Sequence, residues 1–388
     1  MHRLLANTRL LVLLLLTIVC MAFCSCTGCN TDNGNHGKAE PVDTFSYKGY
    51  TNLANLLAGK ASTVDADFMN DITSSPAYET HKVAMTTMWG RYRVSDVDVI
   101  RQWSAENLKQ NVDTVFYPFG GPDFNYLASF FPDCRFSILV GIEDVGKLPF
   151  IDQLSKSKYQ EVLTGMRALL SSNVGLSYFH TLSMEEDLDC YLKGTMPVIM
   201  MYAALHGYDV ITINPVKIEA DGTLSYVEPD KIFAHTMEKK AGDGFEMLYR
   251  KPGEKGARKA YYLNSDLSDA VFPTSGMSKV IERNFKGKLT FVKVASYLLH
   301  EPDFSAVKKS LLDNSKVVIS GPSGMPFEAY DKNLWDLKFY GKYIAPIPQF
   351  ADYPQESLKE TYKKANASPI NFRFDYHSSA SFIMATKK

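Results

Sequence analysis

The 388-residue chain lacks an excess of charge of either sign. Lys plus Arg number 42 and Asp plus Glu number 43, which gives a formal net charge of -1. No strong field is therefore available to recruit a polyanion or an acidic membrane surface, and we expect no nucleic-acid partner. At 45% hydrophobic and 22% charged residues, the composition is that of an ordinary globular protein.

Cysteine is also scarce in the body of the chain. Four of the six cysteines stand within the first thirty residues, and only Cys134 and Cys190 follow. No C-x-x-C spacing remains there, which argues against a structural zinc site. Cys134 and Cys190 either form a disulfide after export or remain buried free thiols.

The familiar catalytic motifs are missing as well. The chain contains no G-x-S-x-G, H-E-x-x-H, G-x-x-x-x-G-K-[ST] or G-x-G-x-x-G. These motifs mark common hydrolases, zinc proteases and nucleotide-binding proteins, so each of those classes is disfavoured. The sequence predicts neither a reaction nor a cofactor.

The N-terminus has the order of an export signal. Arg3 and Arg9 precede an apolar run of about 14 residues, and small residues and cysteines follow. The run is shorter than the roughly 20 residues of a membrane-spanning helix. We therefore predict a signal peptide over residues 1–29.

The end of this segment resembles the lipid-acceptor site of bacterial lipoproteins. Small residues, Ser25 and Gly28, precede Cys26 and Cys29. The resemblance implies that Cys26 or Cys29 carries a lipid that holds the protein on the bacterial cell envelope, on its periplasmic or outer face. Without that modification, we expect a secreted protein.

The remainder divides into a tether and a body. Residues 30–45 are polar and rich in Asn, Gly and Pro, and they predict a flexible tether. Residues 46–388 show no second linker and predict one body, either with a single core or as two packed lobes.

Periodicity predicts an α/β fold. Apolar residues at helical spacing over 159–170 indicate an amphipathic helix, and residues 198–205 are apolar on every side, as in a buried helix. Asp221-Gly222 predicts a β-hairpin, and residues 245–263 predict a second one with a solvated, charged tip. Strands and helices alternate elsewhere, so we expect a mixed, largely parallel sheet flanked by helices, with antiparallel hairpins in the middle third.

The stretch from residue 116 to 144 is the first candidate site. It predicts a strand, a turn, a helix and a second strand that ends near two carboxylates. Convergence of Asp123, Glu143 and Asp144 would provide a general acid and base or hold a divalent cation. Alternatively, Asp123 caps a helix that begins at Phe124, and the other two lie in a solvated turn.

His180 is the most suggestive histidine, because Glu185 and Glu186 follow it closely. A histidine near carboxylates serves as a tuned base or as a metal ligand, and otherwise as a hydrogen-bonded structural residue. Asp123, Glu143 and His180 together form our candidate catalytic set.

A weak internal repeat extends this site. An offset of 180 residues aligns Pro122-Asp123-Phe124 with residues 302–304. The same offset aligns Gly141 with Gly321. If the repeat is real, both loops lie at the carboxyl ends of strands, where open α/β sheets bind ligands. The candidate ligand-binding residues are Gly120, Gly121, Asp144, Gly321 and Ser323.

Much of the body resembles a family of uncharacterised bacterial secreted proteins. The resemblance rests on "FYPFGGPDF", "FFPDCRFSILVGIEDVG", "YFHTLSM", "GTMPVIMMYAALHGYDV", "SYLLHEPDFSAVKKSLLDNS" and "GMPFEAYDKNLWDLKFYGKYIAPIPQF", and it spans roughly residues 85–350. The family has Ser at the position of Gly120 and Asp-Asp at the position of Gly321-Pro322. The resemblance implies an exported α/β protein and assigns no activity.

Two functions follow as hypotheses. The first is a lipid-anchored protein that binds a small molecule or an envelope component without catalysis. The second is a metal- or carboxylate-dependent hydrolase that uses Asp123, Glu143 and His180.

Overall fold

The computed structural model describes residues 47–61, 71–108, 112–146, 156–176, 194–227, 243–376 and 380–388. These residues belong to one compact unit, Asp43–Lys388. The predictions for Cys26, Cys29, His180 and Cys190 lie outside the described residues, as do those for residues 1–45.

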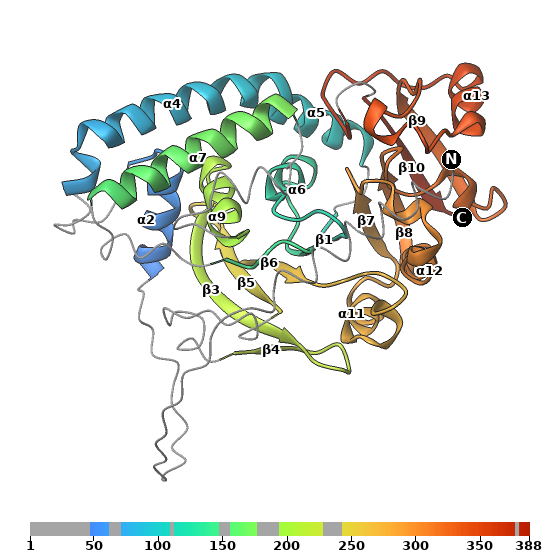
Figure 1. Cartoon of the computed structure of the whole chain (residues 1–388), viewed down its shortest axis with the longest axis horizontal. Helices are drawn as coiled ribbons and strands as arrows, with labels where there is room; N and C mark the ends of the chain where they lie inside the picture. Colours follow the sequence, from blue (N-terminus) through green and yellow to red (C-terminus); the bar gives the residue numbers. More distant parts are fainter. Residues whose placement is uncertain are drawn as a thin grey trace, which may run out of the picture. The chain divides into compact units, whose positions relative to one another are not determined.

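In the described residues, ten strands form one sheet (Figure 1). Their order across the sheet is β4-β3-β5-β6-β2-β1-β7-β8-β10-β9. The strands are β1 (Thr114–Tyr117), β2 (Phe136–Gly141), β3 (Asp209–Ile218), β4 (Leu224–Tyr226), β5 (Gly244–Arg250), β6 (Arg258–Asn264), β7 (Lys288–Val292), β8 (Ser315–Ser320), β9 (Trp335–Gly341) and β10 (Ser381–Lys387).

The five central strands, β6-β2-β1-β7-β8, run parallel, and the sheet continues antiparallel on both sides. This arrangement confirms the α/β class and the mixed sheet. The expected largely parallel character holds only for the centre, because hairpins extend one end of the sheet and the C-terminal strands extend the other. Both predicted hairpins form: Gly222 turns the chain between β3 and β4 with a φ of 81°, and β5 pairs with β6.

Helices cover both faces of the sheet. One face carries α2 (Tyr47–Leu57), α4 (Pro76–Tyr92), the π-helical η1 (Arg93–Val97), α5 (Asp98–Asn107), α6 (Phe124–Phe130), α7 (Lys156–Leu176) and α9 (Met196–Leu205). The other face carries α11 (Gly276–Asn284), α12 (Ser305–Asn314) and α13 (Glu356–Lys364). Short 3-10 turns are η3 (Phe272–Thr274), η4 (Leu298–His300), η5 (Pro302–Phe304), η6 (Phe327–Ala329) and η7 (Pro348–Phe350).

The two helices predicted from apolar spacing are both present. Helix α7 buries the expected stripe from Tyr159 to Leu170, and every residue of α9 is buried. Helices α4 and α7 lie side by side (Figure 1). Such an all-apolar helix as α9 needs partners around its whole circumference, and α2, α6 and β3 are among the elements that contact it.

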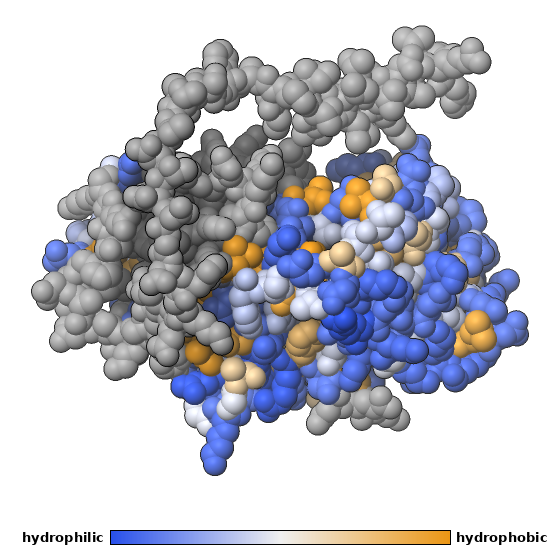
Figure 2. Space-filling view, turned by 90° about the horizontal axis from the view of Figure 1, so that it is seen from below, coloured by the Kyte–Doolittle hydropathy of each residue, from blue (hydrophilic) through white to orange (hydrophobic). Residues whose placement is uncertain are grey.

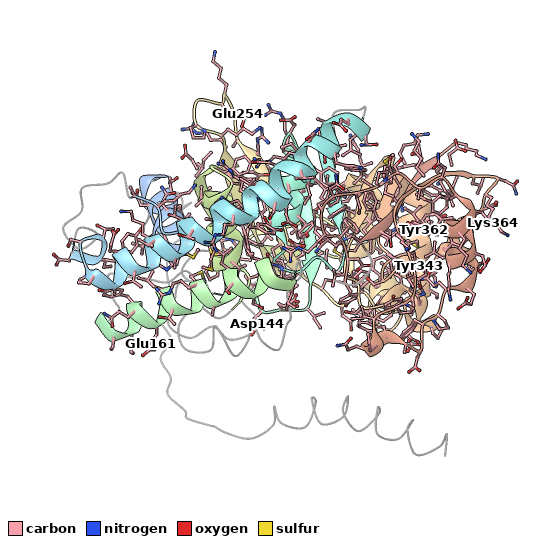
Figure 3. All side chains as sticks on the ribbon, turned by 90° about the horizontal axis from the view of Figure 1, so that it is seen from above. Asp144, Glu161, Glu254, Tyr343, Tyr362 and Lys364 are labelled. Carbon is pink, nitrogen blue, oxygen red and sulfur yellow. The ribbon has the colours of Figure 1, made fainter. Side chains whose placement is uncertain are left out.

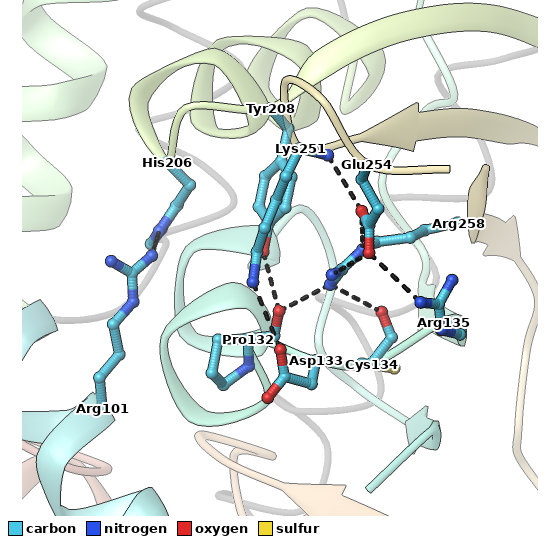
Figure 4. Close-up of polar contacts among 10 residues, drawn as sticks. All are labelled: Arg101, Pro132, Asp133, Cys134, Arg135, His206, Tyr208, Lys251, Glu254 and Arg258. Atoms are coloured by element: carbon cyan, nitrogen blue, oxygen red, sulfur yellow. Dashed lines mark hydrogen bonds and ion pairs between the residues drawn. The ribbon is translucent and has the colours of Figure 1, made fainter. Parts of the chain in front are cut away.

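The tip of the β5–β6 hairpin corrects one expectation. We expected its basic residues to be solvated, but Arg258 is only 3% exposed. Figure 4 shows its contacts. Its guanidinium pairs with Glu254 at 2.8 Å and donates to the carbonyl oxygens of Pro132 and Cys134. Five donors on a planar group allow one buried arginine to join this tip to the loop before β2.

Hydrophobic and hydrophilic residues are interspersed on one face of the described residues (Figure 2). On the face drawn in Figure 2, hydrophobic residues form small separate groups among hydrophilic ones. Of the helices in the described ranges, none combines the length and the apolarity that crossing a bilayer requires.

Candidate functional site

The candidate site lies where the connectivity of the parallel strands reverses. The chain passes from β1 through α6 to β2 on one side, and from β7 through α12 to β8 on the other, while β1 and β7 are neighbours. Helices α6 and α12 consequently lie on opposite faces of the sheet. Open α/β sheets bind ligands at the carboxyl ends of their strands at such a point. We call the residues that follow β1, β7 and β8 (118–123, 293–297 and 321–325) the carboxyl edge.

A buried ion pair occupies the centre of the carboxyl edge. The Lys293 Nζ lies 3.2 Å from Asp123 Oδ2, and the two side chains are 0% and 5% exposed. The same ammonium group lies 3.8 Å from the ring centre of Tyr126. Burial lowers the pKa of the Lys293 amine, and the nearby Asp123 carboxylate opposes that shift.

Asp123 is fully engaged by its surroundings. Its Oδ1 accepts from the Tyr126 amide at 3.1 Å, which caps α6, and its Oδ2 also accepts from the Tyr117 hydroxyl at 2.9 Å. The helix-capping alternative is therefore present in the structure. It coexists with the ion pair to Lys293, so one carboxylate links β1, α6 and β7.

A second buried carboxylate, Asp375, joins the ends of β7 and β8. It accepts from the Val294 amide at 3.1 Å, the Ser323 amide at 2.9 Å and the Ser323 hydroxyl. A side chain at Gly321 would exclude it, because a Cβ there would lie 2.4 Å from Asp375 Oδ2. Burial raises the pKa of Asp375, while the bonds from Ser323 oppose the shift.

Backbone strain is concentrated at the same place. Among the described residues, five non-glycine residues have positive φ angles: Phe119, Val294, Ser296, Tyr297 and Asp375, at 50–60°. Four of them belong to the carboxyl edge, and Asp375 hydrogen-bonds to it. Such conformations cost about 1–3 kcal/mol each and gather at functional sites, where surrounding contacts hold them. Val294 is the most unfavourable of the five, because β-branched residues rarely adopt this conformation.

The segment between β9 and β10 covers the carboxyl edge. We call residues 342–376 the cap. The Gln355 amide donates to the Pro322 carbonyl at 2.8 Å, and the Tyr376 and Ser296 hydroxyls lie 2.9 Å apart. Rings of the cap also pack on Tyr297, whose ring centre lies 5.0 Å from that of Phe350.

Arg373 fastens the cap to the helical layer. Its Nε lies 3.2 Å from Asp96 Oδ1, in the π-helical turn η1, and its Nη1 donates to the Gly175 carbonyl in α7 at 2.8 Å. Asp96 is 4% exposed, so this pair is partly desolvated. The cap is thus tied to the carboxyl edge and to the helical layer on one face of the sheet.

The remaining predicted residues lie nearer β2. Gly120 and Gly121 belong to the carboxyl edge, and the half-buried Glu143 carboxylate folds over Gly121 and Gly141, where a Cβ on Gly141 would lie 2.2 Å from Glu143 Oε2. Asp144 is exposed, and Figure 3 places it on the α7 side, away from the labelled Tyr343 of the cap.

The structure thus brings six of the predicted residues together in two groups, and Asp144 lies outside both (Figure 3). Asp123, Gly120, Gly121 and Glu143 surround the end of β1, whereas Gly321 and Ser323 surround Asp375. Within the described ranges, no three His, Cys, Asp or Glu side chains gather in a way that could hold a metal ion. The acid, base and metal roles of Asp123 and Glu143 stay predictions, and His180 lies outside these ranges.

Sequence reasoning missed Lys293 and Asp375, the two residues that complete the buried network. Lys293 interrupts the apolar run "LTFVKVA" at the end of β7, and a charge inside a strand pattern is a usable signal. Asp375 gives no such signal, because its partners lie 52 and 81 residues away in the chain.

Comparisons with protein-family models, with curated protein sequences and with solved structures found no match. The geometry of the carboxyl edge and the sequence of the N-terminus are therefore the features that bear on function.

Proposed function

We propose that this protein is an exported, lipid-anchored component of the bacterial cell envelope whose α/β body binds a small ligand at the capped carboxyl edge. The N-terminal pattern supports export: a basic start, an apolar run of about 14 residues and the candidate acceptors Cys26 and Cys29. The tether over residues 30–45 would separate the body from the membrane.

The concentration of strained backbone supports the ligand-binding role. All the positive-φ non-glycine residues of the described ranges lie at the carboxyl edge or bond to it. Structural packing alone gives no reason to collect several such conformations at one point, whereas a binding site that must place its groups in fixed positions does. This is the observation on which the proposed function chiefly depends.

We favour binding over the alternative of metal- or carboxylate-dependent hydrolysis. Asp123 is 4% exposed and already engaged by Lys293, Tyr117 and the α6 amide. A general base or metal ligand needs lone pairs directed at substrate or metal. The contacts of Asp123 favour a structural role beside a binding site.

Two measurements test the proposal. Mass spectrometry of the mature N-terminus should find an acylated Cys26 or Cys29, and an unmodified terminus that lacks both would refute the anchor. A thermal-shift screen of the mature protein with metal ions and small envelope metabolites should find compounds that raise its Tm.

The variant Val294→Gly provides the link to the edge. Glycine adopts the φ of 55° without strain, so its Tm should stay within about 2 °C of wild type. The loop of this variant is less fixed, so the same compounds should raise its Tm by less than they raise the Tm of wild type. An equal response of both proteins would place the ligand away from this edge and contradict the proposal.

A further inference from the structure

The cap contains a cavity that borders the carboxyl edge. Its volume is about 180 Å³, and its wall includes the apolar side chains of Ile344, Ala345, Pro346 and Pro354. Gln355 lines the same cavity and donates to the Pro322 carbonyl of the β8 loop. The volume is below the roughly 300–1,000 Å³ of pockets for drug-sized ligands, so a small metabolite fits it best.

Tyr343, which lines the cavity, has a buried hydroxyl without a partner among the described residues. Tyr343 is 4% exposed, and its hydroxyl forms no hydrogen bond with any described residue. Burial raises the pKa of Tyr343 to about 12, and polar groups of Gln355 beside it oppose the shift, but none of them meets the geometry of a hydrogen bond. A buried hydroxyl is normally paired, so this one points to a ligand.

The start of α13 brings further polar groups to the cavity. Gln355 is the N-cap residue of this nine-residue helix, and no side chain caps its first amides. Amides at a helix start have no partner within the helix and attract anions. Glu356 and Lys359 line the cavity as well, as an ion pair of 3.5 Å with exposed fractions of 70% and 34%. Such an exposed pair is weak and exchanges partners at little cost.

We propose that this cavity binds a free α-amino acid with a small apolar side chain. The Tyr343 hydroxyl and the first amides of α13 would receive the carboxylate, and Lys359 adds a positive charge beside it. Glu356 would receive the ammonium group, and the Ile344, Ala345 and Pro346 wall would contact the side chain. The inference deepens the proposed ligand-binding function and depends on it.

L-valine is the probe, and isothermal titration calorimetry on the mature protein is the measurement. We expect L-valine to bind, whereas isovalerate, which lacks the ammonium group, and isobutylamine, which lacks the carboxylate, should bind at least about tenfold more weakly. Equal binding of L-valine and isovalerate would overturn the assignment of an amino acid.

Tyr343→Phe separates a ligand role from a structural one. It removes only the unpaired hydroxyl, so the ligand-free Tm should rise by about 1–2 °C while the L-valine Kd weakens about tenfold or more. Tyr330→Phe is the matched control, because the Tyr330 hydroxyl is also buried without a partner in the described residues but lies outside the cavity. This control should raise Tm similarly and leave the Kd unchanged.

Failure of this inference can be told apart from failure of the proposed function. If L-valine does not bind but another screened compound raises Tm in a Val294-dependent manner, the amino-acid inference is overturned and the edge remains a binding site. If no compound binds, both are overturned. Equal weakening by Tyr343→Phe and Tyr330→Phe would also overturn the inference, because the effect would then not be local to the cavity.

Discussion

The Asp123–Lys293 pair gives the sharpest test of the geometry of the carboxyl edge. Asp123→Asn keeps an oxygen that can cap α6 but leaves the Lys293 ammonium, whose side chain is 0% exposed, without its nearest carboxylate. Lys293→Met fills most of the same volume and leaves the Asp123 carboxylate without its cation. Removal of one member of a buried pair typically destabilises a protein by about 3–5 kcal/mol.

The double variant should behave differently from the sum of the two single variants. Replacement of both members leaves no uncompensated charge, and such replacements are often close to neutral. The side-chain oxygen that Asp123→Asn retains would still accept from the Tyr126 amide, so we expect a loss of about 0–2 kcal/mol in the double variant. Additive single effects would instead predict roughly 6–10 kcal/mol, since each single variant costs about 3–5 kcal/mol.

Urea unfolding followed by circular dichroism measures these free energies. The double variant should be more stable than either single variant. The slope of its unfolding free energy against urea concentration should be unchanged. If the double variant loses the sum of the two single effects, the two charges do not interact, and the description of a buried pair at the centre of the edge is wrong.

Two further predictions concern pH and packing. The partly buried His206 accepts from Arg101 (Figure 4). Its Nε2 lies 3.0 Å from Asn125 Oδ1. Desolvation first, and then Arg101, hold its pKa well below 6.5, so the free energy of unfolding should fall by up to about 2 kcal/mol through this group as pH falls from 7 to 5. Between pH 7 and 5, the free energy of unfolding of His206→Gln should therefore fall by less than that of wild type, and the difference should be the contribution of His206. If urea unfolding gives equal decreases for the two proteins, His206 does not cause this pH dependence. Gly321→Ala should destabilise by about 2–4 kcal/mol, because its Cβ would displace the Asp375 carboxylate, whereas Gly175→Ala, with open space in α7, should stabilise by about 0.5–1 kcal/mol. Similar results for the two glycine variants would refute the close contact with Asp375.

Local patterns predicted the elements well, because they depend on neighbours in the chain. The buried stripe of α7, the all-apolar α9 and the turn at Gly222 follow from spacing and from the conformational freedom of glycine. The proportion of parallel to antiparallel strand pairs in the sheet was not predictable in this way. Strand β10 pairs antiparallel with β8, and β9 pairs antiparallel with β10. These pairings depend on contacts between distant segments, which no local period records.

The candidate site was predicted in part, for the same reason. Strand ends carry loops, so Gly120, Asp123 and Ser323 were placed at the carboxyl edge by pattern alone. Their partners could not be placed, because Lys293 comes 170 residues after Asp123 and Asp375 comes 52 residues after Ser323. A carboxylate in a turn pattern has the same appearance whether water or a buried ammonium group faces it.

The buried network also explains how a strained edge can persist in a stable fold. Four strained residues of the edge would cost about 4–12 kcal/mol together at about 1–3 kcal/mol each, which is comparable to the whole stability of a typical domain. The Asp375 carboxylate holds the Val294 amide, the Tyr376 hydroxyl meets Ser296, and the Phe350 ring packs on Tyr297. All three contacts come from the cap, so any opening of the cap would release strain and contacts together. The geometry of the carboxyl edge and the position of the cap are therefore a single coupled property of the protein.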